Sequence, residues 1–304
     1  MLSVQTIARC RFGRAFTVAW EDACVATTFA TRFAEARSIF GPLVWGLDPS
    51  TEVLEQWGVE DSPAGLERFV DIAIEAVAGT VGLIKPQSAF FERHGWEGIR
   101  ALGRLMEEAR SAGLLVILDV KRGDVGSTND AYAEAYLGVD AALRADAMTV
   151  HPYLGFGAMG RYIELAARGG SCLLVVTRSS NPDGRSIQSA RDEGGRSVEA
   201  GLLDEIGRQN AELAPAALGP IGAVVGPTLI DPELDLRSMN GLFLAPGVGA
   251  QGASPDDVAR VFHACPERVM PSASRSLLVD GPDPSRLRDV AAELAETFRQ
   301  VLAT

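Results

Sequence analysis

The stretch Leu114-Leu115-Val116-Ile117-Leu118-Asp119-Val120-Lys121-Arg122-Gly123-Asp124 joins an apolar run to a cluster of charges. The apolar part predicts a buried β-strand, because it is continuous rather than alternating. Alternate side chains of a strand point the same way, so Asp119 and Lys121 should share one side at its carboxyl end. Asp119 and Asp124 around one ammonium would keep Lys121 charged and repel a neighbouring anion. Most D-x-K sequences are solvated ion pairs, so the rest of the chain must decide.

Seven further short apolar runs have the same character, with helical stretches between them. The eight runs cover residues 43–48, 82–85, 115–119, 147–150, 172–177, 222–226, 242–245 and 269–272. Amphipathic stretches include residues 65–78, 98–112, 129–137 and 255–264. Eight strand–helix units predict an α/β chain that folds as a (β/α)8 TIM barrel in a single domain. A doubly wound open sheet is the main alternative.

Composition excludes several classes of protein. The 304 residues are 47% apolar and 22% charged, with a net charge of −12. That charge argues against nucleic-acid or anionic-membrane partners, and no apolar run is long enough to cross a bilayer. The four cysteines are scattered and form no C-x-x-C pair. Neither a disulfide framework nor a structural zinc site is expected, which fits a cytoplasmic protein.

The first 25 residues are a separate case. Glu21 and Asp22 end the apolar run 15–20 before a signal-peptide core could form. No glycine-rich or catalytic pattern occurs there. We predict a poorly ordered N-terminal arm over residues 1–25 and a barrel domain over residues 26–304.

Polar residues gather after the predicted strands, where a barrel of this class places its chemistry. They are Asp48, Lys85, the Asp119 to Asp124 cluster, His151, the run Thr177 to Pro182, the loop Pro246 to Gly252, and Ser274-Arg275-Ser276. Singly, each has a simpler explanation: Asp48 before Pro49 suits a turn, and His151 before Pro152 suits a structural histidine. Their joint placement on one rim indicates a site.

The last two loops predict a phosphate site. Gly247, Gly249 and Gly252 can adopt positive φ angles and bring backbone N–H groups close to a ligand. Arg275, after the eighth strand, can fork onto a phosphate. The loops after strands seven and eight are the recurrent phosphate site of this barrel class.

Taken together, these motifs resemble the orotidine 5′-phosphate decarboxylase family, and more closely its bacterial branch with the longer chain (type 2). The resemblance spans about residues 40–278. The matching pieces are Gly46-Leu47-Asp48-Pro49, Lys85, Asp119-x-Lys121-x-x-Asp124 with Thr128, Ser180-Asn181-Pro182, the loop Pro246 to Gly252, and Ser274-Arg275-Ser276. Six ordered motifs make an accidental similarity improbable.

The resemblance implies a reaction: decarboxylation of orotidine 5′-phosphate to UMP, the last step of de novo pyrimidine nucleotide synthesis, without metal or cofactor. Lys121 would donate a proton to C6 of the pyrimidine. Asp119 would face the substrate carboxylate, and Lys85 would hold the charged array and contact the ribose.

The resemblance also implies substrate ligands and a partner. Asp124 and Thr128 would reach into the site of a neighbouring subunit, so a homodimer is expected. The other implied ligands are Asp48 for a ribose hydroxyl, Ser180 for the pyrimidine ring, and Gln251 and Arg275 for the phosphate.

Two departures and two alternatives accompany this interpretation. Ser179 stands where the family pattern has Thr, and residues 1–25 have no counterpart. The nearest alternative is a Mg²⁺-dependent sugar-phosphate decarboxylase or aldolase on the same barrel, which shares D-x-K-x-x-D. The other is an inactive nucleotide-binding barrel, which would gain little from crowding these charges together.

Overall fold

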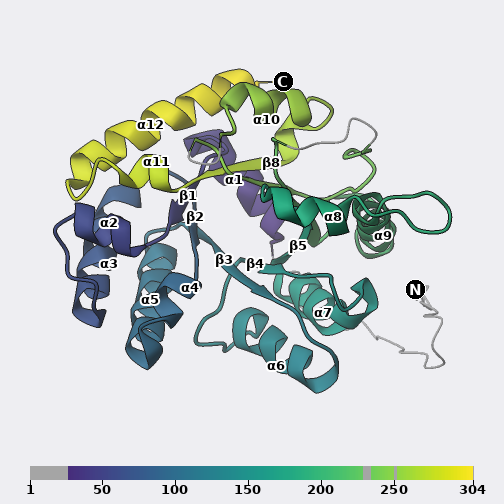
Figure 1. Cartoon of the computed structure of the whole chain (residues 1–304), viewed down its shortest axis with the longest axis horizontal. Coiled ribbons are helices and arrows are strands. Elements are labelled where there is room, and N and C mark those ends of the chain that lie inside the picture. The colour runs from purple at the N-terminus through teal and green to yellow at the C-terminus, as the bar shows by residue number, and fades with distance from the viewer. Residues whose placement is uncertain (1–26, 229–233, 250–251, 304) are drawn as a thin grey trace, which may run out of the picture.

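The computed structural model describes residues 27–228, 234–249 and 252–303 (Figure 1). Eight parallel strands follow one another around a closed barrel, and the eighth pairs with the first. They are β1 Val44–Leu47, β2 Leu83–Pro86, β3 Leu115–Arg122, β4 Ala147–Val150, β5 Cys172–Arg178, β6 Ile221–Val225, β7 Phe243–Pro246 and β8 Val269–Ala273. The predicted barrel is confirmed, and the open sheet was the wrong alternative. The predicted arm over residues 1–25 lies outside the described residues.

Helices surround the ring of strands (Figure 1). The α-helices are α1 Phe29–Phe40, α2 Thr51–Gln56, α3 Pro63–Val77, α4 Ala89–Glu92, α5 Gly95–Ser111, α6 Gly126–Leu137, α7 Gly160–Gly169, α8 Arg185–Gln188, α9 Val198–Leu213, α10 Pro255–Val261, α11 Arg275–Leu278 and α12 Pro284–Val301. The described residues also form the 3₁₀ turns η1 Phe156–Met159, η2 Pro182–Gly184 and η3 Pro266–Arg268. The last helix, α12, follows β8 and packs beside α3, which follows β1, so the outer layer of helices closes as the barrel does. Across the described ranges, no helix is both long and apolar enough to span a membrane.

Alternate strand residues build two apolar layers, which explains the continuous apolar runs. Val44 and Leu83 point into the barrel, while Trp45 and Ile84 point toward the helices. Both kinds are buried. Removing apolar surface from water on both faces is the main stabilisation of such a sheet.

Helix α1 lies outside the repeating strand–helix pattern and closes the amino-terminal end of the barrel. Phe29 and Phe33, one turn apart, are each 1% exposed and pack with the inward-facing strand residues. Arg32 forms an ion pair with Asp146, just before β4, and donates to the Gly170 carbonyl before β5. Helix α1 does not cover the opposite end of the barrel, where the carboxyl ends of the strands lie.

Strand β3 is longer than predicted and irregular. It runs through Arg122, three residues beyond the expected end, so Asp119 and Lys121 belong to the strand. Between two register pairs with β4, β3 advances four residues, from Leu118 to Arg122, while β4 advances two. The extra residues bulge from the ladder, and Lys121 takes a φ of 44°, in the left-handed region.

Candidate active site

A cavity of about 310 Å³ opens at the carboxyl ends of the strands. Six of the predicted site residues line it: Asp48, Lys85, Asp119, Lys121, Ser180 and Arg275. They lie directly after β1, in β2 and β3, in the loop after β5 and at the start of α11. The closed barrel therefore brings together residues that are more than 200 positions apart in sequence.

Asp119 is the centre of the charged array. Its Oδ2 accepts from Lys85 Nζ at 3.0 Å, and its Oδ1 accepts from Lys121 Nζ at 2.6 Å. Asp48 Oδ1 lies 4.0 Å from Lys85 Nζ. Carboxylates and ammonium groups thus alternate along the row. The side chains of Lys85 and Asp119 are 8% and 9% exposed, whereas that of Lys121 is 41% exposed. Lys121 is the ammonium that a ligand in the cavity can reach.

The pKa shifts agree with this arrangement. Burial opposes the charge on Asp119, but Lys85 and Lys121 outweigh it and hold the pKa of the Asp119 carboxyl well below its usual range. Burial likewise opposes the charge on Lys85, but Asp119 and Asp48 raise its pKa above the ordinary value. Opposite charges at this distance favour the ionised forms of both groups. The buried pair therefore stays charged at neutral pH.

The two lysines of this site are the only lysines in the chain. The sequence has 28 Lys and Arg residues, and all except Lys85 and Lys121 are arginines. Arginine holds its proton too tightly to give it up, whereas a lysine ammonium can both carry charge and transfer a proton. The restriction of lysine to these two positions is therefore a further sequence signal for the site.

Sequence reasoning missed two polar residues that contact the array, Gln87 and Thr149. Gln87 Oε1 accepts from Lys121 Nζ at 3.2 Å. Thr149 is 1% exposed, and its hydroxyl lies 2.8 Å from Asp119 Oδ1. Thr149 is the one polar residue of β4, Ala147–Val150, which could have marked it.

Asp124 and Thr128 lie outside this cavity. Asp124 is half-buried, its Oδ1 accepts from the backbone N–H of Val125 at 2.7 Å, and Thr128 is exposed. Within the described part of the chain, no ion pair joins Asp124 to Lys121. Only one of the two predicted carboxylates, Asp119, therefore contacts Lys121 within a single chain. The loop itself is fixed, because the buried Asn129 accepts from Asp124 N and donates to the Ala158 carbonyl.

The loop after β5 carries Ser180 and Asn181 into the cavity. Its base is held by Arg178, whose Nη2 donates to Glu199 Oε1 at 2.6 Å, with both side chains at most 2% exposed. Gln188 Oε1 accepts from Ser179 N at 3.1 Å and braces the next residue. Two hydrogen-bonded anchors thus position the loop.

The loop after β7 has the backbone predicted for it. Gly247, Gly249 and Gly252 have φ angles of 96°, 75° and 85°. A side chain at position 249 would also be crowded, because a Cβ there would lie 2.9 Å from Ser276 Oγ. Arg275 is exposed and faces the same cavity as Gly247. The predicted ligand Gln251 lies outside the described residues.

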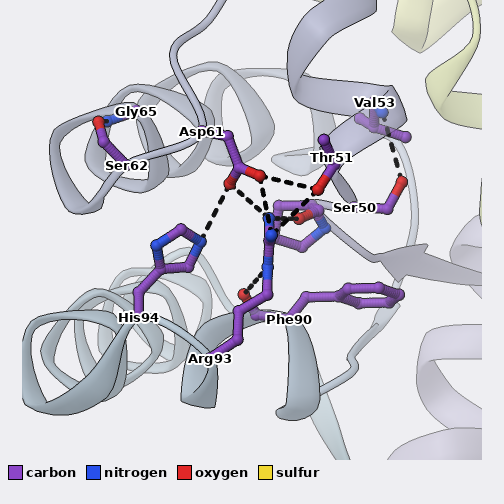
Figure 2. A network of polar contacts seen from close by, with 10 residues as sticks. Ser50, Thr51, Val53, Asp61, Ser62, Gly65, Phe90, Arg93 and His94 are labelled. Atoms are coloured by element: carbon purple, nitrogen blue, oxygen red, sulfur yellow. Dashed lines mark hydrogen bonds and ion pairs between the residues drawn. The ribbon is translucent and has the colours of Figure 1, made fainter.

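A second polar network holds the loop that follows Asp48 (Figure 2). Arg93 donates from Nη1 and Nη2 to the two oxygens of Asp61, at 2.8 and 2.5 Å. Its Nη1 also donates to Thr51 Oγ1 at 3.0 Å, and His94 Nε2 lies 3.2 Å from Asp61 Oδ1. Hydrogen bonding from Arg93 lowers the pKa of the Asp61 carboxyl. This network ties the β1 loop to α4, which follows Lys85.

The array offers little to a metal ion. Both oxygens of Asp119 already accept from lysines, and an ammonium is no metal ligand. Over the described ranges, no three His, Cys, Asp or Glu side chains are grouped so as to hold a metal ion. His151 lines a separate cavity, and the pKa of its ring is lowered by partial burial and by Lys121.

Comparison with known proteins gives one consistent family. Residues 41–284 match the model of the "Orotidine 5'-phosphate decarboxylase / HUMPS family". The chain is 47% identical over 271 residues to an orotidine 5′-phosphate decarboxylase of Streptomyces coelicolor, covering 89% of this chain and 97% of that one. The corresponding enzyme of Myxococcus xanthus is 44% identical over 278 residues, covering 91% and 96%.

Solved structures share the fold. A crystal structure from Streptomyces avermitilis, provisionally assigned as an orotidine 5′-phosphate decarboxylase, superposes with a TM-score of 0.88 at 44% identity, covering 94% of this chain and all of that one. The OMP decarboxylase of Leishmania donovani gives a TM-score of 0.73 at 26% identity, covering 91% of this chain and all of the other.

Proposed function

Because the chain belongs to the orotidine 5′-phosphate decarboxylase / HUMPS family, we propose that it converts orotidine 5′-phosphate to UMP with Lys121 as the proton donor. One observation supports this above all: the two lysines of the chain bond to the two oxygens of Asp119 at the carboxyl end of the barrel. The curated relatives above are decarboxylases, which disfavours a Mg²⁺-dependent sugar-phosphate enzyme.

The proposed chemistry needs only an ammonium and a fixed carboxylate. The bond between C6 and the carboxylate breaks, CO₂ leaves, and the electron pair stays on C6. The Lys121 ammonium stabilises that charge and then gives its proton to C6, forming the C–H bond of UMP. The lysine is reprotonated from solvent. Asp119 keeps Lys121 aimed into the cavity, and Lys85 neutralises Asp119 from the buried side.

The remaining lining residues suit the rest of the substrate. We assign Asp48, beside Lys85, to a ribose hydroxyl and Ser180 to the pyrimidine ring. Arg275, with the positive-φ glycines of the β7 loop, is assigned to the phosphate, as is Gln251. Binding energy from a phosphate remote from C6 can be used to orient the reacting end of the substrate.

We also propose a homodimer in which Asp124 and Thr128 complete the partner's site. Among the described residues of its own chain, no basic side chain forms an ion pair with Asp124, although Asp124 follows the D-x-K motif closely. Apolar side chains lie exposed beside this loop: Val125 is 54% exposed, Tyr153 79% and Leu154 53%. Exposed apolar side chains next to a site are typical of an interface.

We propose that the reaction uses no metal or cofactor and takes place in the cytoplasm. The first proposal rests on the donor set around Asp119 described above. The second is supported by Cys172 and Cys265, which are buried free thiols as expected in a reducing compartment.

The direct test is the loss of orotidine 5′-phosphate absorbance on adding protein that has been treated with EDTA. We expect turnover by the parent chain and almost none by Lys121→Ala. Failure of the parent to consume this substrate, together with Mg²⁺-dependent turnover of a sugar phosphate, would contradict the proposal.

A further inference from the structure

Thr149 is a buried polar residue in the otherwise apolar strand β4. It is 1% exposed in β4 and stands opposite the bulge of β3. Bulges remove backbone groups from the regular ladder, and the freed N–H groups need other acceptors. Lys121 is such a case, because its backbone takes a left-handed φ of 44°.

The Thr149 hydroxyl supplies the missing acceptor. Lys121 N donates to Thr149 Oγ1 at 3.0 Å. Since Oγ1 accepts there, its own proton is directed to Asp119 Oδ1, 2.8 Å away. One buried hydroxyl thus bridges the backbone of one residue and the carboxylate of the other. The direction of donation is fixed, because a backbone N–H can only donate and an ionised carboxylate can only accept.

The bridge has a consequence for Lys121. A non-glycine residue in the left-handed region is strained and persists only where its surroundings hold it. Two anchors hold Lys121: its backbone bonds to Thr149, and its Nζ bonds to Asp119. Asp119 is itself fixed by Lys85 and Thr149. Without the hydroxyl, the backbone anchor of Lys121 and one of the donors to Asp119 are lost together.

We propose that Thr149 is a positioning residue for the decarboxylation, which sets the direction of the Lys121 ammonium through the β3 bulge. The proposal rests on the function proposed above and extends it to a residue outside the D-x-K-x-x-D motif. Misplacing a reacting group by about 1 Å can cost about 100-fold in rate. The loss should fall on kcat, because the assigned substrate ligands Ser180 and Arg275 come from the loop after β5 and from α11, not from β3 or β4.

The test compares Thr149→Val with Thr149→Ser. Valine keeps the size and branching of threonine but has no hydroxyl, so the strand should still fold. We expect kcat of Thr149→Val to fall at least about tenfold, with KM and the dissociation constant of UMP within about threefold of the parent. Thr149→Ser retains the hydroxyl and should keep kcat within about threefold. Thr149→Ala serves as a second hydroxyl-free variant should the valine protein not fold.

The chain offers a matched control in Thr177. It is a buried strand threonine, 0% exposed, whose hydroxyl donates to the Val175 carbonyl at 3.1 Å, and it does not line the catalytic cavity. Thr177→Val should lose a buried hydrogen bond of similar worth and leave kcat unchanged. A general effect of deleting a buried hydroxyl would instead lower both variants alike.

A spectroscopic readout separates positioning from stability. Since the chain has two lysines, protein labelled with ¹³C at lysine Cε gives two side-chain signals. In Thr149→Val the signal that disappears in Lys121→Ala should shift, and that of Lys85 should shift less. Parent kcat in a folded Thr149→Val protein, or equal impairment of the serine variant, would overturn the inference. Absence of turnover in the parent chain would instead overturn the proposed function, and the two failures are therefore distinguishable.

Discussion

Lys121 Nζ lies 2.6 Å from Oδ1 of Asp119, two residues earlier on the same strand. A left-handed backbone at Lys121 and a buried carboxylate together direct this ammonium into the cavity. The pair is therefore a fixed unit rather than a surface ion pair of marginal worth.

Replacing Lys121 should abolish turnover without unfolding the chain. Its side chain is 41% exposed, so Lys121→Ala leaves no cavity in the core. We expect a fall in kcat of about 10²-fold to 10⁴-fold, because general acid catalysis contributes on that order. Lys121→Arg keeps the charge but binds its proton more tightly, and should remain impaired. Activity of Lys121→Ala within about tenfold of the parent, a loss of only ~1.4 kcal/mol, would remove Lys121 from the reaction.

Arg275→Ala should weaken UMP binding and lower turnover as well. Losing charged hydrogen bonds to a phosphate costs about 1.5–3 kcal/mol, or at least about tenfold in affinity. Calorimetric titration with UMP measures this directly. Arg286→Ala is the matched control, since Arg286 is 67% exposed and pairs with Asp280 instead. If Arg275→Ala bound UMP as tightly as Arg286→Ala, the phosphate would have to lie elsewhere.

Mixing two inactive variants tests the shared site. Lys121→Ala and Asp124→Ala homodimers should both be severely impaired. In a mixed dimer one site receives both defects and the other receives neither, so random pairing should restore up to about a quarter of parental activity per site. Native mass spectrometry can establish that mixed dimers form. No recovery in their presence would mean that each site is built from one chain.

Removal of metal should leave the rate unchanged. The two oxygens of Asp119 accept from Lys85 and Lys121, so the array has no free pair of carboxylate oxygens for Mg²⁺. The measurement is turnover before and after dialysis against EDTA, with a Mg²⁺ add-back as control. Activity that returned only with Mg²⁺ would place the protein among the metal-dependent members of this barrel group.

Stability should depend on pH through Asp119. Its pKa is depressed in the folded chain, so the unfolded chain takes up a proton first as the pH falls. The stabilisation is complete above the unfolded pKa, about 3.9, and is lost as the pH falls toward the folded value. Asp119→Asn should be destabilised at pH 7 by about 3 kcal/mol, since Lys85 then lacks its main buried partner. Urea unfolding should show that difference shrinking below about pH 4; a difference independent of pH would contradict it.

The raised pKa of Lys85 acts at the other end of the scale. Its stabilisation is complete below the unfolded pKa, about 10.4, and is lost only as the pH rises through the folded value. With two lysine signals in the labelled protein, the titration of Lys85 can be followed directly. It should remain protonated above about pH 10.4.

The sequence by itself determined the barrel and the rim on which the site lies. Continuous apolar runs of strand length, separated by helical stretches, leave few architectures that bury both faces of a sheet. The glycines of the β7 loop were also predictable, because positive φ angles are costly for other residues. These features follow from local spacing and from the conformational limits of single residues.

Only the tertiary structure decided how the array is held. The bulge of β3 depends on its register with β4. The hydrogen bonds of Thr149 to β3 and of Arg93 to Asp61 join segments about 30 residues apart in sequence. Helix α1 closes the barrel only because Phe29 and Phe33 find apolar partners on several strands at once. Local periodicity fixes which way a side chain points from its own strand. It does not fix which residue of another strand that side chain contacts, because closure of the barrel sets the distance between strands.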